Sequence, residues 1–464
     1  MSTTAAQRKG ILVVHPDGAA SWWSHRVPAV AAVTVTVGHG AAVQVDAAYP
    51  QQVLAWSVVA GGDIEALARA LDDPQLVARV QVLTAATDEV LPDDAPVLAT
   101  AWQRRATVAA VDQCSVRPIS EDALLLDRAE VALETGNSDA AERLFALAAP
   151  TLLHLGEQCL DGILVGIVAA DVARVAGVAA EALNAHGWGP DIQELARRLA
   201  DELDATVDHE IAAIADWVAA VGVQTHLGEG APGTFLATYV DPAVVPQRLL
   251  AWTGADHPDL MVEIASDETA LVSVYLDAAT DMRSPDIMQL LAYAAEPDGT
   301  VVAVAPMHVV GRALVATLSF AGRDGATLSF GVYHADVDPA RLRTDPLGHV
   351  LVEVDRWMLD AFSRHRYARA LLYASTAGDD HDAQKRQHTQ LGIARTAAEN
   401  AIELLESYVA PAGTDQRAAE LLVARRDAIR SYRESLIAHQ HYPDSLRPLL
   451  AEVVEPEPAE DGDA

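Results

Sequence analysis

Apolar and polar residues alternate along two parts of this chain and recur at helical spacing along much of the rest. The two-residue period, typical of half-buried strands, marks residues 10–59 and 260–334. The three-to-four-residue period of amphipathic helices marks residues 121–221 and 346–439. These patterns predict an α+β fold. Two strand-containing domains with antiparallel sheets flank a central helical block, and a long αα-hairpin follows at the C-terminal end.

Changes of period and clusters of turn residues divide the chain into segments. Helical spacing ends before the Gly-rich residues 228–233 and alternation begins after them, so we expect a linker there. The predicted segments are an N-terminal α+β domain (1–120), the helical block (121–227), the linker (228–233), a second α+β domain (234–377), the C-terminal helical hairpin (378–445) and an acidic disordered tail (446–464).

Two β-hairpins are predicted from alternation around glycine-containing turns. In the N-terminal domain, residues 33–37 and 42–45 alternate on either side of Gly38-His39-Gly40. In the second domain, residues 312–321 and 326–334 flank residues 322–325, which predicts an antiparallel hairpin over 312–334. Residues 285–295 are expected to form a short helix between strands.

The helical block opens with a pair of segments joined by a glycine turn. Small residues at Ala129, Ala141 and Ala148 allow close helix approach, Phe145 fills the space between the helices, and Pro150 is expected to end the pair. This spacing resembles one tetratricopeptide-type hairpin. A second copy at the family's period of about 34 residues is missing, so a generic αα-hairpin is the alternative.

Two long helices are predicted near the C-terminal end, over residues 383–409 and 415–439. Their apolar stripes should pack the helices on each other, on a sheet or on a partner. The stripe positions are Leu391, Ala394, Ala398, Ile402, Leu405 and Val409 in the first helix and Ala418, Leu421 or Leu422, Ile429, Tyr432 and Leu436 in the second.

The charge balance excludes several partner classes. The formal net charge is −34 and the pI is about 4.6, so nucleic acids and anionic membrane surfaces would be repelled. Arginine supplies nearly all of the positive charge, because lysine occurs only at positions 9 and 385. This bias is typical of a high-GC coding background or of modest salt adaptation, and we expect a bacterial protein.

Cysteine content and hydropathy predict the compartment. Two cysteines cannot build a disulfide framework in 464 residues, which indicates a reducing environment. The apolar run near the N-terminus is too short for a signal-peptide core. The most apolar long stretch, residues 162–183, carries Asp171, Arg174 and Glu181, which favours a buried helix over a membrane span. We therefore expect a cytoplasmic protein.

The common catalytic motifs are missing from the sequence. We find no G-x-S-x-G, no phosphate loop and no C-x-x-C, and His209-Glu210 is not followed by a histidine at position 213. Residues 228–233 match G-x-G-x-x-G, but a helix precedes and a strand follows. This is the reverse of the order a dinucleotide site needs. We predict no cofactor.

One polar cluster has the composition of a metal site. Asp379, Asp380, His381 and Asp382 lie in a predicted loop, and His388 follows shortly after. Carboxylates and imidazoles at this density can bind a divalent ion. The alternative is a solvated acidic loop in which Asp382 caps the next helix.

Other basic and imidazole side chains gather nearby. The histidines at 334, 349 and 365 either converge on one site or are unrelated, and the arginines at 364, 366 and 369 either bind an acidic ligand or pair with neighbouring acids. The sequence leaves both questions open.

Three functions are compatible with these patterns. The first is a non-catalytic protein-interaction or regulatory protein with a protein partner or self-association. The missing catalytic motifs and the two helical hairpins favour it. The second is a metal-dependent enzyme centred on Asp379–His388. The third is a structural subunit of a homo-oligomer.

Overall fold

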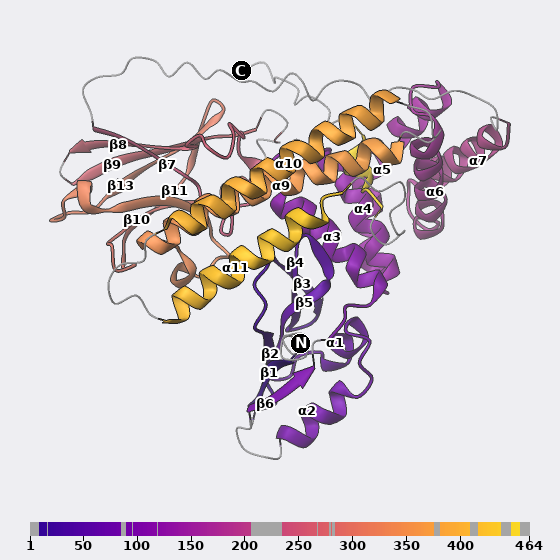
Figure 1. The fold of residues 1–464 in the computed structure, drawn as a ribbon. Coiled ribbons are helices and arrows are strands. Elements are labelled where there is room, and N and C mark those ends of the chain that lie inside the picture. Colours follow the sequence, from indigo (N-terminus) through magenta and orange to yellow (C-terminus); the bar gives the residue numbers. More distant parts are fainter. Residues whose placement is uncertain are drawn as a thin grey trace.

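The computed structural model describes residues 9–15, 17–84, 90–94, 96–117, 119–205, 234–266, 268–277, 280, 284–374, 381–408, 416–437 and 447–454. Within these residues the chain is a mixed α+β protein whose strands form three antiparallel sheets, which confirms the predicted fold class. Figure 1 shows the long C-terminal helices crossing the middle of the molecule. The second strand region lies on one side, the helical block on the other, and the N-terminal sheet below.

The N-terminal sheet has six described strands in the order β3-β4-β5-β2-β1-β6. The predicted hairpin around His39 is confirmed, because β3 and β4 pair antiparallel on either side of it. Trp22 and Trp56 lie opposite each other in neighbouring strands and are buried in the core. The strands are β1 (Lys9–Val14), β2 (Ala20–Ser24), β3 (Ala32–Gly38), β4 (Ala41–Asp46), β5 (Tyr49–Val58) and β6 (Val90–Asp94).

Among the described residues, three helices pack on one face of this sheet. Helix α1 (Ile64–Ala70) packs on β3 and β4, α2 (Leu76–Thr84) on β1, and α3 (Thr100–Cys114) on β3 and β5. Burial in β3 alternates accordingly, with the valines buried and the residues between them exposed. On the opposite face, which we call the open face, the described residues Trp23, Thr34 and Ser57 are exposed to solvent.

The helical block begins with the predicted antiparallel pair. Helix α4 (Glu121–Glu134) is capped by Ser120, and α5 (Ser138–Leu160) packs along it. Phe145 is fully buried between them, as expected. The prediction that Pro150 ends the pair is wrong. Helix α5 continues through Pro150 because its second half buries Leu152 and Leu155 against α6 (Gly166–Ala182) and α7 (Gly189–Ala205).

The second strand region contains two packed sheets around one core. One has the order β12-β13-β9-β8-β7 and the other β11-β10-β14. Their bounds are β7 (Thr234–Thr238), β8 (Leu260–Ser266), β9 (Thr269–Tyr275), β10 (Leu290–Ala295), β11 (Val301–Pro306), β12 (His308–Val310), β13 (Ala313–Ser319) and β14 (Ser329–His334).

Two predictions for this region are wrong. Strands β13 and β14 form where alternation placed them, but β13 pairs with β9 and β12 while β14 pairs with β10, so residues 312–334 are not a hairpin. The segment between them contains a 3₁₀ turn (Gly325–Thr327). The ring of Phe320, which directly follows β13, packs against that of Phe330 in β14, with the ring centroids 5.9 Å apart. Residues 285–295 form only a short helix, α8 (Pro285–Met288), followed by β10.

Three long helices complete the fold. Helix α9 (Pro346–Ala374) packs along α10 (His381–Ser407), which packs along α11 (Gln416–Ser435). This confirms the C-terminal helical hairpin. The predicted stripe of α10, from Leu391 to Leu405, is buried, as are Ile429, Tyr432 and Leu436 of the second stripe. At the start of α11, Ala418 and Leu422 are half-buried and Leu421 is exposed, and Val409 lies outside the described residues. The buried residues share one core with the N-terminal sheet, so the two ends of the chain stabilise each other.

The beginning of the predicted disordered tail is ordered, which corrects that prediction for residues 447–454. Helix α12 (Leu450–Val453) lies against α4 and α9, and its apolar residues join the core of the helical block. The Arg366 guanidinium donates two hydrogen bonds to the Glu452 carboxylate, one to each oxygen. The bond from Nε to Oε1 is 2.7 Å long. Apolar burial and a buried ion pair fix this segment despite its distance from the helical block in sequence.

Buried arginines connect parts of the chain that lie far apart in sequence. Arg356 in α9 is fully buried and bonds Asp259 and the carbonyls of the 254–257 loop. Arg343 bridges Asp241 and Asp355, and Arg425 bonds Asp355 and the Val30 carbonyl. Arg248 bridges Asp112, Glu121 and Asp286. We refer to these four residues, Arg248, Arg343, Arg356 and Arg425, as the arginine clamps.

No helix among the described residues is long and apolar enough to cross a membrane. Residues 206–227 of the predicted helical block and the predicted linker at 228–233 fall outside the described residues. The domain boundaries remain predictions.

Candidate interaction site

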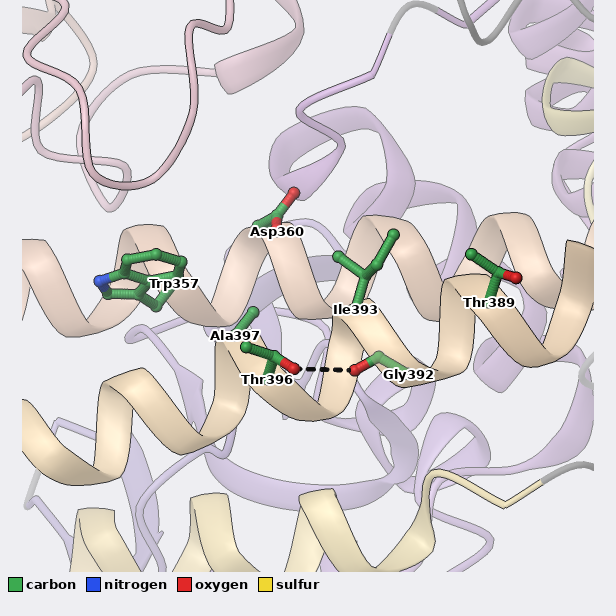
Figure 2. A pocket seen from close by; sticks show the side chains of 7 residues that line it. All are labelled: Trp357, Asp360, Thr389, Gly392, Ile393, Thr396 and Ala397. Atoms are coloured by element: carbon green, nitrogen blue, oxygen red, sulfur yellow. Dashed lines mark hydrogen bonds between the residues drawn. The ribbon is translucent and has the colours of Figure 1, made fainter.

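A groove of about 430 Å³ opens on the surface between α9 and α10 (Figure 2). Trp357 and Asp360 of α9 line one wall, and α10 supplies the other. We call this cavity the α9–α10 groove. Its α10 residues are Thr389, Gly392, Ile393, Thr396 and Ala397.

The threonine hydroxyls of the groove are already used within the protein. Thr396 donates its hydroxyl to the Gly392 carbonyl at 3.2 Å, a contact drawn in Figure 2, and Thr389 donates to the Lys385 carbonyl at 3.0 Å. Because each hydroxyl donates its single proton to its own helix, the groove offers no hydroxyl donor to a ligand. The α10 wall is therefore mainly apolar.

Asp360 is the one ionisable side chain in the lining. Arg364, one turn further along α9, donates to its carboxylate at 3.3 Å. Burial raises the pKa of Asp360, and the neighbouring Arg364 opposes that rise. The groove thus lacks the several convergent polar groups by which sites for small molecules usually fix their ligands.

Gly392 makes the middle of the groove hollow. A Cβ atom placed there would have no neighbour within 4 Å, so packing inside the protein does not require glycine at this position. Glycine within a helix costs about 1 kcal/mol relative to alanine. The adjacent Ile393 is 37% exposed, so an apolar side chain stands beside a place where backbone can be approached closely.

Three of the five residues of the predicted metal cluster lie among the described residues. His381 begins α10 and Asp382 lies in its first turn, and both are exposed. His388 is directed to its own helix, with Nδ1 2.7 Å from the Gln384 carbonyl oxygen. Asp379 and Asp380 lie outside the described residues. Among those described, no three His, Cys, Asp or Glu side chains lie close enough to hold an ion. The cluster remains a prediction.

The histidines and arginines near the groove have separate contacts. His365 Nδ1 lies 3.2 Å from the Tyr432 hydroxyl. His334 Nδ1 lies 3.7 Å from an Asp336 carboxylate oxygen. Arg364 pairs with Asp360, and Arg366 with Glu452. For these two arginines, pairing with neighbouring acids is confirmed.

The sequence did not identify the groove, although it contained a signal. Threonine, glycine and threonine recur at 389, 392 and 396, which is helical spacing on the side of α10 away from its predicted apolar stripe. The arginine clamps had no local signal, because their partners lie elsewhere in the sequence.

Comparisons with known proteins add no relative. No protein-family model, no curated protein and no solved structure matches the chain.

Proposed function

We propose that this chain is a non-catalytic protein-interaction protein whose α9–α10 groove receives a helix of a partner protein. The observation that carries the proposal is the combination of an open, mainly apolar groove with two threonine hydroxyls and one carboxylate that already have partners inside the protein. Such a surface can bury an apolar ridge but has little with which to orient or activate a substrate.

The shape of the groove favours a helix as the occupant. It runs between two packed helices, and Gly392 would let a third helix approach closely. The arginine clamps and the shared core hold α9 and α10 in place, so the groove would be preformed and little ordering would oppose binding.

Charge decides which helices fit. The chain carries a formal net charge of −34, and Asp360 is the only ionisable group in the lining. We therefore expect a helix with an apolar ridge flanked by lysine or arginine, because an acidic helix would be repelled. The two cysteines are free and buried, and we place the interaction in the cytoplasm.

A photo-crosslinking residue at position 393, in the groove, tests the proposal. Position 423 is the matched control, because Val423 is also an exposed apolar residue of the C-terminal helices but lies on α11. We expect crosslinking from 393 to one polypeptide segment that has helical spacing and basic residues. A synthetic peptide of that segment should bind the purified protein, more weakly after Ile393→Asp and unchanged after Val423→Asp.

Three outcomes would overturn the assignment: equal labelling from both positions, no labelling from 393, or capture of a segment without apolar helical spacing. Capture of a second copy of this chain at 393 would assign the groove to self-association. Capture of a small molecule there would replace the protein partner with a ligand.

A further inference from the structure

Among the described residues, β4 is the only strand beside β3, so β3 is an edge strand of the N-terminal sheet. The Ala47 N–H donates to the Ala31 carbonyl at 2.9 Å, and the same register continues through Val33 opposite Val45. In an antiparallel pair, alternate residues direct both backbone groups to the partner. The backbone groups of Ala32, Thr34 and Thr36 therefore point away from β4.

This edge has little of the protection usual for exposed strands. Proteins commonly place charges, proline or bulges on such edges. Residues 32–38 read AVTVTVG, without charge or proline, and the one register shift with β4 comes at the end, between Thr36 and Gly38. The opposite edge strand, β6, reads VLPDD and contains both devices.

The open face beside this edge is also uncharged. The exposed side chains of β2 to β5 on this face include Trp23, Ala32, Thr34, Thr36 and Ser57, and Gln44, which lies among them, is half-buried. In a chain of formal charge −34, most surfaces of two copies would repel each other. Two copies could meet along this edge at little electrostatic cost.

We propose that β3 pairs antiparallel with β3 of a second copy, joining the two N-terminal sheets into one continuous sheet. With Thr34 opposite Thr34 of the second copy, Ala32 falls opposite Thr36, so every outward-pointing residue of one strand meets one of the other. A two-fold interface must be self-complementary in this way. Threonine faces threonine on the open side, a favourable cross-strand pair, and the inner valines of the two strands come together.

Substitutions on the edge, with a control on the neighbouring face, test the pairing. Thr34→Pro removes an N–H that points outward, so the isolated chain should fold while the pairing is blocked. Thr36→Lys adds a charge at the edge and is a second test that does not depend on tolerance of proline. Ser57→Lys places the same charge on the same open face but on the interior strand β5.

Light scattering and sedimentation of the full chain provide the measurement. We expect a reversible dimer of twice 49.1 kDa. Both edge variants should weaken its association by about tenfold or more, and Ser57→Lys should leave it nearly unchanged. Thr34→Cys should form a covalent dimer on mild oxidation and Ser57→Cys should not, since the two native cysteines are buried.

A wild-type chain that stays monomeric up to its solubility limit would overturn the proposal. So would a dimer that survives both edge variants, or one that is lost only in Ser57→Lys, because that pattern would assign the contact to the open face. None of these results bears on the α9–α10 groove.

Discussion

The Asp127 carboxylate in α4 accepts the backbone N–H of Ala451 at 3.0 Å, although the two residues lie 324 positions apart in sequence. The second oxygen accepts the N–H of Leu450 at 3.1 Å, and an Arg104 guanidinium nitrogen lies 3.4 Å away. The Asp127 side chain is buried, so these donors replace the water it has lost. A single carboxylate thereby holds the start of α12 on the helical block.

This contact should make stability depend on pH. Burial raises the pKa of Asp127 to about 7, against 3.8 in the unfolded chain, so the folded state holds the proton more tightly. The resulting stabilisation is complete below pH 4 and is lost as the pH rises to about 7, by at most about 1.4 kcal/mol per pH unit. Urea unfolding of Asp127→Asn between pH 5 and 7.5 should show a weaker loss than wild type.

Glu403→Gln is the control for this measurement, because Glu403 is an exposed acid on α10. It should leave the wild-type pH dependence intact. A steep loss of stability in Asp127→Asn equal to that of wild type would show that another group titrates in this range.

The contact between Asp127 and Ala451 also shows why part of the fold was not predictable. Local patterns located β3, β4, α4, α5, α10 and α11, because the spacing of apolar residues that are close in sequence distinguishes a helix from a strand. They did not show that β13 and β14 join different sheets, since pairing depends on β9 and β10, which are far away in sequence. The acidic composition after residue 446 also concealed a short segment that the helical block holds in place.

The same limit applied to the candidate site. Its α10 residues lie on a helix that the sequence predicted, but the α9 wall and the hollow at Gly392 come from the packing of two helices. The clamp arginines were equally hidden, because Arg356 and Asp259 are 97 positions apart. Sequence patterns show which side of a helix is polar, but not what lies opposite it.

Replacing Arg356 with alanine should cost about 3–5 kcal/mol of stability, since it leaves Asp259 buried without its charged partner. The Arg356 guanidinium carbon lies 4.9 Å from the Tyr239 ring centroid and 4.6 Å from that of Trp252, so packing is lost as well. Urea unfolding measures the loss. Arg197→Ala removes an exposed ion-paired arginine and should cost far less, because water screens that pair. Similar losses for both would contradict the clamp.

Truncating Phe145 to alanine should destabilise the protein by about 3–5 kcal/mol, because the side chain is fully buried between α4 and α5. Leu147, two residues further along α5, is 69% exposed, and Leu147→Ala should change stability by no more than about 0.5 kcal/mol. Thermal or urea unfolding distinguishes the two. A mild effect at Phe145 would mean that the helix pair can collapse around the lost ring.

The metal hypothesis predicts a bound divalent ion, whereas the interaction proposal requires none. A site at residues 379–388 requires a stoichiometric divalent ion that a chelator removes and that the double substitution Asp380→Ala with His381→Ala abolishes. Elemental analysis of untagged protein measures this. We expect no stoichiometric ion, because His388 is directed to its own helix and His381 and Asp382 are exposed. The exposed pair Asp161 and His186, changed to alanine, controls for adventitious binding.

Gly392→Ala should affect protein stability and binding of the partner helix in opposite directions. The new methyl group meets nothing within 4 Å and alanine is the better helix former, so stability should rise by about 0.5–1 kcal/mol. Gly177→Ala in α6 is the matched control, because a Cβ there also meets nothing within 4 Å and should stabilise to a similar extent. Only Gly392→Ala fills the groove, so it alone should weaken binding of the partner helix. If it stabilises the protein and leaves binding unchanged, close approach at Gly392 is not part of recognition.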